Sequence, residues 1–573
     1  MSTLEPTLDP PLDRATAEGS AQPGTRAGAR SLVGVLTSSD HKVIGRLLIG
    51  SAVVGLVAVG ALGALLGLER IDGDGTLLRR SALTQLFAGY RVGLVEAVLL
   101  PLMLGLCVIA VPLQLGARSL AFPRAAAAGW WAWLGGMVLV VVALANNGGP
   151  FGGNETMVGL YVAANALALL GLTMVAGTVA TSVLTTRAPG MRMKRVPLFS
   201  WSAVVMSIGL VLVLPVAVGV HVFVYVDYQY TRGAFGAASG IPGWTFYLLT
   251  GPVLALFALP AIGFVAELVP VVFRQRLPLR PVALAGLGLV GVAALAGVTQ
   301  QQVVELPWVG SGLSLSELGT KLADLITLGV LVGLPVLGVL VVLGVAALAA
   351  KPVKVRGETV RPNLIAPFAF AFFGVNLIFI GMIVGLVNGI DDLGLQGTVF
   401  EEAGAIYVVY GAVTVGFGAV AYWIPKLTGR LLPTPALLGL AALSALGTVL
   451  ASLPYVWAGF ADQPASSAVY DNGGPGELLN LAVTAGHGLM LLAALGFAGL
   501  VLPALVGLAG ATSADDDDGA SGDDPWHAHT LEWATTSPAP VDNFDVVHSV
   551  MSPEPLLDSR AAPDFARDTK ATA

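Results

Sequence analysis

Two adjacent carboxylates, Glu401 and Glu402, open the apolar stretch TVFEEAGAIYVVYGAV, which covers residues 398–413. A charge inside a bilayer is costly, so such a residue usually pairs with an opposite charge or marks a path for protons or ions. Other apolar stretches are also interrupted by charges, at Arg91, Glu96, Glu267 and Asp324. These side chains could carry protons, or they could be paired charges with a structural role.

Histidine is the other residue type that could do chemistry here, because imidazole is a strong nitrogen ligand for iron and copper. Only two of the six histidines, His221 and His487, lie in long apolar segments. The other four precede the first apolar stretch or lie near the C-terminus: His41, His527, His529 and His548. The lone cysteine, Cys107, excludes an intrachain disulfide and a thiolate metal cluster.

The elements that must position these residues are membrane helices. The chain has 573 residues, of which 55% are hydrophobic and 11% are charged, and its mean hydropathy is +0.81. These values lie far outside the range of soluble domains. A helix needs about 20 apolar residues to cross a bilayer. Twelve stretches qualify: 43–67, 86–115, 128–147, 156–185, 200–226, 245–272, 282–304, 322–349, 364–389, 398–424, 434–458 and 479–508. We therefore predict an all-α polytopic membrane protein with about twelve transmembrane helices.

The loops between these stretches indicate an orientation, because lysine and arginine favour the cytoplasmic side. Alternate loops are basic, as in RAPGMRMKR, whereas the opposite loops are acidic or rich in glycine, as in NGIDDLG. Both termini are therefore expected in the cytoplasm. We expect residues 1–38 to be a disordered tail, 39–510 the membrane domain and 511–573 an acidic, mostly extended tail. The expected partner is the lipid bilayer, and no nucleic acid is expected.

Several segments resemble subunit I of the heme-copper respiratory oxidases, above all the cytochrome c oxidase type. They include SSDHKVIGRL, VPLQLGARSLAFPR, RAPGMRMKRVPLFSW, YWIPKLTGRLL and the tail segment DPWHAHTLEWATTSPAPVDNFD. These segments follow the family's order between residues 39 and 546. The resemblance implies the family's helix bundle, a place in the plasma membrane of a prokaryote, and other respiratory subunits as partners.

The resemblance also implies a site in which six histidines bind one copper ion and two hemes. Other residue types stand at those positions in this sequence: Tyr90, Gly251, Gln300, Gln301, Ala403 and Ala405. An aliphatic side chain cannot replace imidazole as a ligand. We therefore expect neither heme nor copper in this chain. For His221 and His487 we favour hydrogen bonds within the bundle over a heme held between them. For the glutamines we favour interhelical hydrogen bonds over weak metal binding.

The pairing of the intramembrane charges can be predicted from the same resemblance. In the family, the helix that corresponds to that of Arg91 faces the one that corresponds to that of Glu401 and Glu402. The two glutamates lie four and three residues before Ala405, so both fall near the helix face that the family uses for heme. We predict an ion pair between Arg91 and Glu401 or Glu402, against the alternative that these charges are hydrated at the outer interface.

These expectations leave three functions open. We favour a structural or regulatory relative of oxidase subunit I, within a respiratory assembly and without redox chemistry of its own. The first alternative is a working cytochrome c oxidase subunit I, which reduces oxygen and pumps protons, with a partner chain supplying the missing ligands. The second is an ion or proton transporter built around Arg91, Glu401 and Glu402.

Overall fold

The computed structural model describes most of the chain. The described residues are 32–73, 75, 78–249, 251–299, 315–351, 354–355, 358–359, 361–470, 475–506, 512–513, 523–546 and 548–560. The chain divides into two units, Met1–Ser38 and Ser39–Ala573. In the first unit the structure describes one short helix, α1 (Leu32–Leu36).

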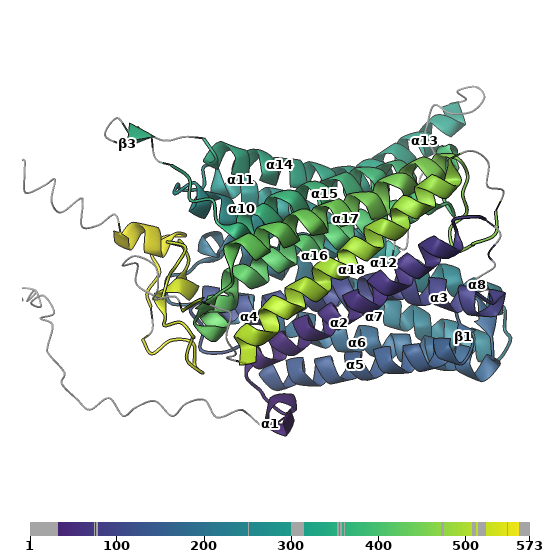
Figure 1. Cartoon of the computed structure of the whole chain (residues 1–573), viewed down its shortest axis with the longest axis horizontal. Coiled ribbons are helices and arrows are strands. Elements are labelled where there is room, and N and C mark those ends of the chain that lie inside the picture. The colour runs from purple at the N-terminus through teal and green to yellow at the C-terminus, as the bar shows by residue number, and fades with distance from the viewer. Residues whose placement is uncertain are drawn as a thin grey trace, which may run out of the picture. The chain divides into compact units, whose positions relative to one another are not determined.

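The second unit is a helix bundle (Figure 1). Eleven helices among the described residues are long and apolar enough to cross a membrane. Eight are uninterrupted: α2 (His41–Glu69), α5 (Pro123–Ala145), α6 (Glu155–Thr185), α7 (Leu198–Gln229), α15 (Ala366–Asn388), α16 (Val399–Thr428), α17 (Thr434–Phe460) and α18 (Gly476–Val506). Three are composite: α3 (Arg80–Val92) with η1 (Gly93–Leu99) and α4 (Leu100–Gln114); α11 (Arg280–Val290) with η3 (Gly291–Ala293) and α12 (Ala294–Thr299); and α13 (Leu315–Leu328) with η4 (Gly329–Gly333) and α14 (Leu334–Ala349). The predicted all-α membrane fold is confirmed.

The remaining elements are short. The helices are α8 (Ala237–Phe246), α9 (Val253–Phe257), α10 (Leu259–Val272), η2 (Met193–Arg195), η5 (Asp391–Leu393) and η6 (Leu531–Ala534). Among the described residues, two-residue strands form three antiparallel pairs: β1 (Gly148–Gly149) with β2 (Gly152–Gly153), β3 (Lys354–Val355) with β4 (Glu358–Thr359), and β5 (Arg430–Leu431) with β6 (Thr512–Ser513).

The stretch 245–272, predicted as one helix, is broken. It is divided among the end of α8, the short α9 and α10. Gly251 adopts a left-handed conformation with φ of 76°, and Pro252 follows it directly. Proline has no amide hydrogen to donate, and a left-handed residue cannot continue a right-handed helix. The prediction of one continuous sixth helix was therefore wrong, although the stretch remains in the bundle.

Proline also accounts for the two π-helical segments. Segment η1 ends just before Pro101, and η4 ends just before Pro335. Because the proline nitrogen cannot donate to the carbonyl four residues earlier, the hydrogen-bond ladder shifts locally to a wider turn.

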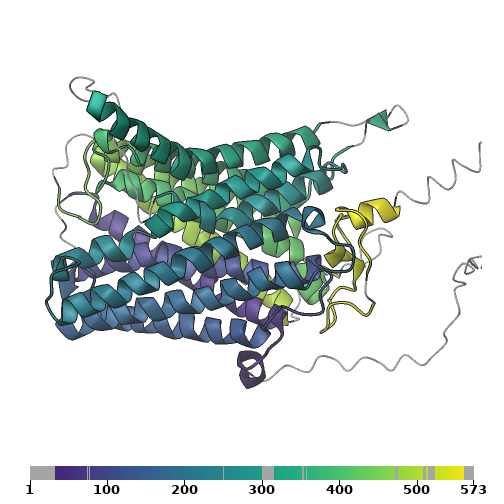
Figure 2. The same ribbon diagram turned by 180° about the vertical axis from the view of Figure 1, so that it is seen from behind.

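Two helices run through the interior of the bundle. The most apolar window of α16 is entirely buried, and that of the composite helix α3–η1–α4 is almost so. Around them, α2, α15, α17 and α18 pack with part of their surface exposed (Figures 1 and 2). Residues on α16 and on α3–η1–α4 are therefore surrounded by other helices.

Glycines let neighbouring helices approach at backbone distance. Gly374 of α15 and Gly411 of α16 face each other, and a Cβ atom added to either would lie within 3.0 Å of the carbonyl oxygen of the other. Gly486 of α18 lies against Ala451 of α17 in the same way. Such small-residue contacts are a common means of packing membrane helices.

Part of the C-terminal segment docks at one end of the bundle, where α2 begins and α16 ends (yellow in Figure 2). Lys42 Nζ donates hydrogen bonds to the carbonyl oxygens of Pro540 and Val541, both at 3.0 Å, and to Asn543 Oδ1 at 2.8 Å. Asn543 Nδ2 in turn donates to the carbonyl oxygen of Ala117 at 2.8 Å. A charged amine with three acceptors makes a strong anchor for this segment.

A second anchor inserts the tail residue Glu532 into the bundle. Glu532 is fully buried, and its Oε1 accepts hydrogen bonds from Gln114 at 3.2 Å and Trp423 at 3.4 Å. The Gln114 amide also donates to the carboxylate of Glu267 in α10. Burial raises the pKa of Glu532 above its usual range. One amide thus links a tail carboxyl group to a helix carboxyl group.

Tail docking is expected to depend on pH through His529. Burial, with Arg560 and Arg276 nearby, lowers the pKa of His529 from 6.5 to about 4. Between pH 4 and pH 6.5, His529 of an undocked tail therefore binds a proton more readily than His529 of the docked tail. Docking weakens as pH falls below 6.5. At pH 5 the weakening is about 2 kcal/mol, or roughly 30-fold in the docking equilibrium.

Limited proteolysis of the tail at pH 7 and pH 5 measures this effect. The raised pKa values of Glu532 and of Glu554, both set first by burial, act in the opposite direction, because undocked carboxyl groups lose their protons at lower pH. The variant His529→Gln keeps those two groups and removes the histidine. At pH 5, relative to pH 7, the tail of His529→Gln should therefore resist proteolysis better than the tail of the native chain. The same change in cleavage in both chains would contradict the role given to His529.

Candidate functional site

The centre of the candidate site is a buried ion pair between Arg70 and Glu402. Arg70 Nη1 lies 3.0 Å from Glu402 Oε2 and Nη2 lies 3.3 Å from Oε1, so the guanidinium addresses both carboxylate oxygens. Arg70 also donates to the hydroxyl of Tyr455 at 2.6 Å and to the carbonyl of Ser467 at 3.0 Å. The amide of Ser466 donates to Glu402 Oε1 at 3.3 Å. The two side chains are only 1% and 5% exposed, and these hydrogen bonds compensate their burial.

Both residues of the ion pair, Arg70 and Glu402, are held in position at the end of a helix. Arg70 follows the last residue of α2, and its amide bonds to carbonyl oxygens in the final turn. Glu402 lies in the first turn of α16, which Thr398 caps by accepting a hydrogen bond from the Phe400 amide. The positive end of the α16 dipole favours a carboxylate at this position. The guanidinium of Arg70 also stacks over Phe87 of α3 at 4.6 Å. The pair thus connects α2, α3, α16 and α17.

Arg91 and Glu401 lie at the edge of this pair. Arg91 Nη2 is 3.7 Å from Glu401 Oε1 and 4.0 Å from Glu402 Oε1. The side chains of Arg91 and Glu401 are 13% and 16% exposed, and the guanidinium lies over the ring of Phe246 at 5.6 Å. The structure therefore brings the three predicted residues together, but the closest cation to Glu402 is Arg70.

His487 of α18 extends the polar cluster inward. Its Nδ1 lies 2.8 Å from the hydroxyl of Tyr410 on α16, and its Nε2 lies 3.4 Å from the hydroxyl of Tyr90 on α3. Both tyrosine rings meet the imidazole edge to face at 5.6 Å. Gly63 of α2 provides the space for the ring, because a Cβ atom there would lie 2.6 Å from His487 Nδ1.

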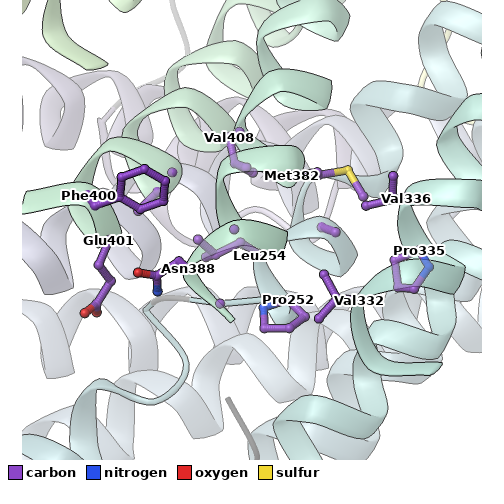
Figure 3. A pocket seen from close by; sticks show the side chains of 16 residues that line it. Pro252, Leu254, Val332, Pro335, Val336, Met382, Asn388, Phe400, Glu401 and Val408 are labelled. Carbon is purple, nitrogen blue, oxygen red and sulfur yellow. The ribbon is translucent and has the colours of Figure 1, made fainter. Parts of the chain in front are cut away.

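A small cavity adjoins the cluster on the side of Glu401 (Figure 3). Its volume is about 30 Å³, which is enough to hold a water molecule. Gly251 and Ala405 line it, and its polar residues, Glu401 and Asn388, lie close together (Figure 3). The cavity is otherwise apolar, with Pro335 among its walls.

The positions predicted from the family's ligand pattern fall in three places. Tyr90 belongs to the polar cluster, Gly251 and Ala405 line the cavity, and Ala403 is fully buried in α16. Gln300 and Gln301 lie outside the described residues.

The other intramembrane groups are held apart from this cluster. His221 Nδ1 is 2.8 Å from the carbonyl oxygen of Ala217, one turn earlier in α7. The carboxylate of Glu96 lies 2.9 Å from the side-chain amide of Asn165. Asp324 lies partly exposed on α13. Each of these groups therefore has its own surroundings and adds nothing to the cluster.

Sequence reasoning missed Arg70, Tyr410 and Tyr455. Arg70 falls in the segment LERIDGDG directly after the first apolar stretch, where it reads as an ordinary loop residue. Both tyrosines lie on interior helix faces, and one tyrosine in an apolar helix carries no distinctive pattern. The one available signal was Arg70 itself, a cation next to a membrane segment on the same side as Glu402.

The polar cluster has no room for a heme, one of the groups that the resemblance implies. The space enclosed by Gly63, Tyr90, Glu402 and His487 is too small for a water molecule, and both ring nitrogens of His487 contact tyrosine hydroxyls. The cluster therefore does not fit a heme at this point of the bundle. Within the described ranges, no three His, Cys, Asp or Glu side chains lie close enough together to hold a metal ion.

Known proteins resemble the chain over almost its whole length. Residues 43–498 match the family described as "Cytochrome C and Quinol oxidase polypeptide I". The "Putative cytochrome c oxidase subunit 1-beta" of Streptomyces coelicolor is 27% identical over 95% of this chain and 93% of its own. The "Heme-copper oxidase subunit I+III" of Aeropyrum pernix is 26% identical over 89% of this chain and 61% of its own.

A solved structure of a heme-copper terminal oxidase dimer has the same fold. It aligns with a TM-score of 0.62 and 14% identity, over 93% of this chain and 100% of its own. The resemblance read from the sequence segments is therefore confirmed at the level of family and fold.

The expectation that this chain uses neither heme nor copper is contradicted by these relatives. They are named as cytochrome c oxidase and heme-copper oxidase subunits, and their similarity extends along nearly the entire chain. His487 and His221 are also both buried, at separate places in the bundle. The prediction relied on residue types at six aligned positions, and that basis was too narrow for a statement about the whole protein.

Proposed function

Because the chain belongs to the Cytochrome C and Quinol oxidase polypeptide I family, we propose that it is a structural or regulatory subunit of a respiratory membrane assembly. The observation that carries this proposal is the buried pair Arg70–Glu402, which joins four helices in a region free of space for a substrate. Side chains that hold one another in this way position helices. The space beside the pair is too small for a water molecule, and the adjoining cavity at Glu401 is only about 30 Å³.

The docked tail supports the same role. Lys42 and Glu532 anchor it at the end of the bundle, and these contacts create a surface from segments distant in sequence. A fixed surface of this kind suits contact with another subunit. The names of the relatives, subunit 1 and subunit I+III, are those of components of a larger enzyme.

The proposed location is the plasma membrane of a prokaryote, with both termini in the cytoplasm. The alternation of basic and acidic loops supports this orientation. The relatives from Streptomyces coelicolor and Aeropyrum pernix support a prokaryotic origin.

Affinity purification from native membranes tests the proposal. An affinity-tagged chain, extracted in a mild detergent, should bring other oxidase subunits with it in fixed stoichiometry. Removing the residues after Val506 should release them if the docked tail forms the contact surface. A chain that purifies without any other respiratory subunit would overturn the proposal.

The second candidate is a working terminal oxidase, which the names of the relatives favour. Oxygen uptake with reduced cytochrome c distinguishes the two. A structural or regulatory subunit contributes to uptake only within its assembly, whereas an oxidase subunit I carries the reaction site itself. A reduced-minus-oxidised visible spectrum of the same sample counts the heme that the chain binds.

A further inference from the structure

Two apolar grooves flank α2 on the outside of the bundle. The larger, about 910 Å³, lies between α2, the composite helix α3–η1–α4 and α5. The smaller, about 190 Å³, lies between α2, α4, α16 and α18. Figure 1 shows α2 between α18 on one side and α5 on the other. Both grooves are lined by Arg46, Gly50 and Val54, so they meet on one face of α2.

Arg46 is the charged residue at the end of both grooves. It lies in the second turn of α2, at the end of the bundle where the tail docks, and its Nη2 donates to the carbonyl oxygen of Leu427 at 2.8 Å. That hydrogen bond fixes the guanidinium beside the mouth of the grooves. A guanidinium matches the geometry of a phosphate group and binds it strongly.

The shape of the grooves matches two hydrocarbon chains that diverge from one point. The larger groove follows α2 from Arg46 to Leu62, which is about 24 Å at the rise of an α-helix. Val54 is 71% exposed and lines both grooves, so it forms a ridge between them. A single helix of another protein would lie on one side of this ridge, whereas a molecule with two chains can straddle it.

We propose that the grooves bind one anionic phospholipid, with its phosphate at Arg46 and one acyl chain on each side of α2. Charge complementarity favours this occupant, because the single charged residue in the mostly apolar lining is a cation at the headgroup end. Gly50 matters because it has no neighbouring atom within 4 Å of where its Cβ would lie. A side chain there would therefore start in open space and extend into the grooves.

Native mass spectrometry tests the proposal on the full chain, reconstituted in nanodiscs that contain phosphatidylglycerol and phosphatidylcholine in equal amounts. The native chain should retain one phosphatidylglycerol in preference to phosphatidylcholine. Arg46→Gln should lower that retention at least tenfold. The matched control Arg124→Gln removes an exposed charge at the same end of the bundle, away from the grooves, and should retain the lipid.

A second pair of variants tests the grooves themselves. Gly50→Leu should reduce retention by filling the space, whereas Gly177→Leu should not, because Gly177 is equally unobstructed but lies on α6. Equal retention of both lipids by the native chain would overturn the proposal, as would unchanged phosphatidylglycerol retention in Arg46→Gln. Copurification of a protein segment that crosslinks at position 50 would also overturn it.

Discussion

Replacing Arg70 with methionine is expected to lower the free energy of unfolding by about 3–5 kcal/mol. The change leaves the carboxylate of Glu402, only 5% exposed, without the cation that lies 3.0 Å away. Cys107 provides the measurement, because it is the only cysteine in the sequence and is fully buried. A thiol-reactive fluorophore therefore reports unfolding during a thermal ramp in detergent.

Two further variants separate the ion pair from its surroundings. Glu401→Gln removes a more exposed carboxylate whose nearest cation, Arg91, is 3.7 Å away, and should cost only about 0–1 kcal/mol. The double variant Arg70→Met with Glu402→Met removes both charges and should recover much of the lost stability, because neither charge is then left unpaired. An Arg70→Met variant as stable as Glu401→Gln would contradict the central position given to this pair.

The second large effect is expected at Gly486, where α18 crosses α17. A Cβ atom at this position would lie 2.7 Å from Ala451 Cα and closer still to the Ala451 nitrogen, so the helices must separate to accommodate a side chain. Gly486→Val should therefore cost about 3 kcal/mol, the upper part of the range for overpacked interiors. The same Cys107 thermal assay measures the loss.

Gly488 is the matched control, two residues further along α18. No neighbouring atom lies within 4 Å of the place where its Cβ would be, so Gly488→Val changes helix propensity equally without a steric conflict. The native chain and Gly488→Val should unfold at similar temperatures, well above Gly486→Val. Equal destabilisation by both variants would show that helix propensity, and not packing, determines the cost.

The fold could be predicted from the sequence because membrane spans carry a strong compositional signal. In the part of the chain that the structure describes, eleven long apolar helices appear where the hydropathy indicated them, including the interior helix α16. The broken stretch 245–272 could not be recognised in this way, because hydropathy does not distinguish a continuous helix from one interrupted at Gly251 and Pro252. The glycine and proline themselves indicate the break, but an average of hydropathy over the stretch does not show it.

The candidate site was predictable only in part. Arg91, Glu401 and Glu402 could be placed together because their depths match on helices that face each other in the family. The closer partner Arg70 comes from the end of α2, and its approach to Glu402 depends on how loop 466–467 and Tyr455 fold over the helix ends. Such contacts between distant segments have no pattern in the sequence.

The cofactor expectation shows a different limit. At the positions that we predicted to match the family's ligands, Ala403 and Ala405 have no side-chain donor atom, and the space beside Tyr90 is too small for a heme. Residue types at a few positions nevertheless say little about cofactor use by the whole chain. Its relatives are named as oxidase subunits, and their similarity extends over nearly the entire chain.

Oxygen uptake by the isolated chain tests the proposed role most directly. The chain is purified once as part of its native assembly and once after expression without other subunits, and both samples receive reduced cytochrome c. A structural or regulatory subunit predicts uptake by the assembly and none by the isolated, folded chain, with folding checked by protection of Cys107. Oxygen uptake by the isolated chain at the rate of the assembly would contradict the account.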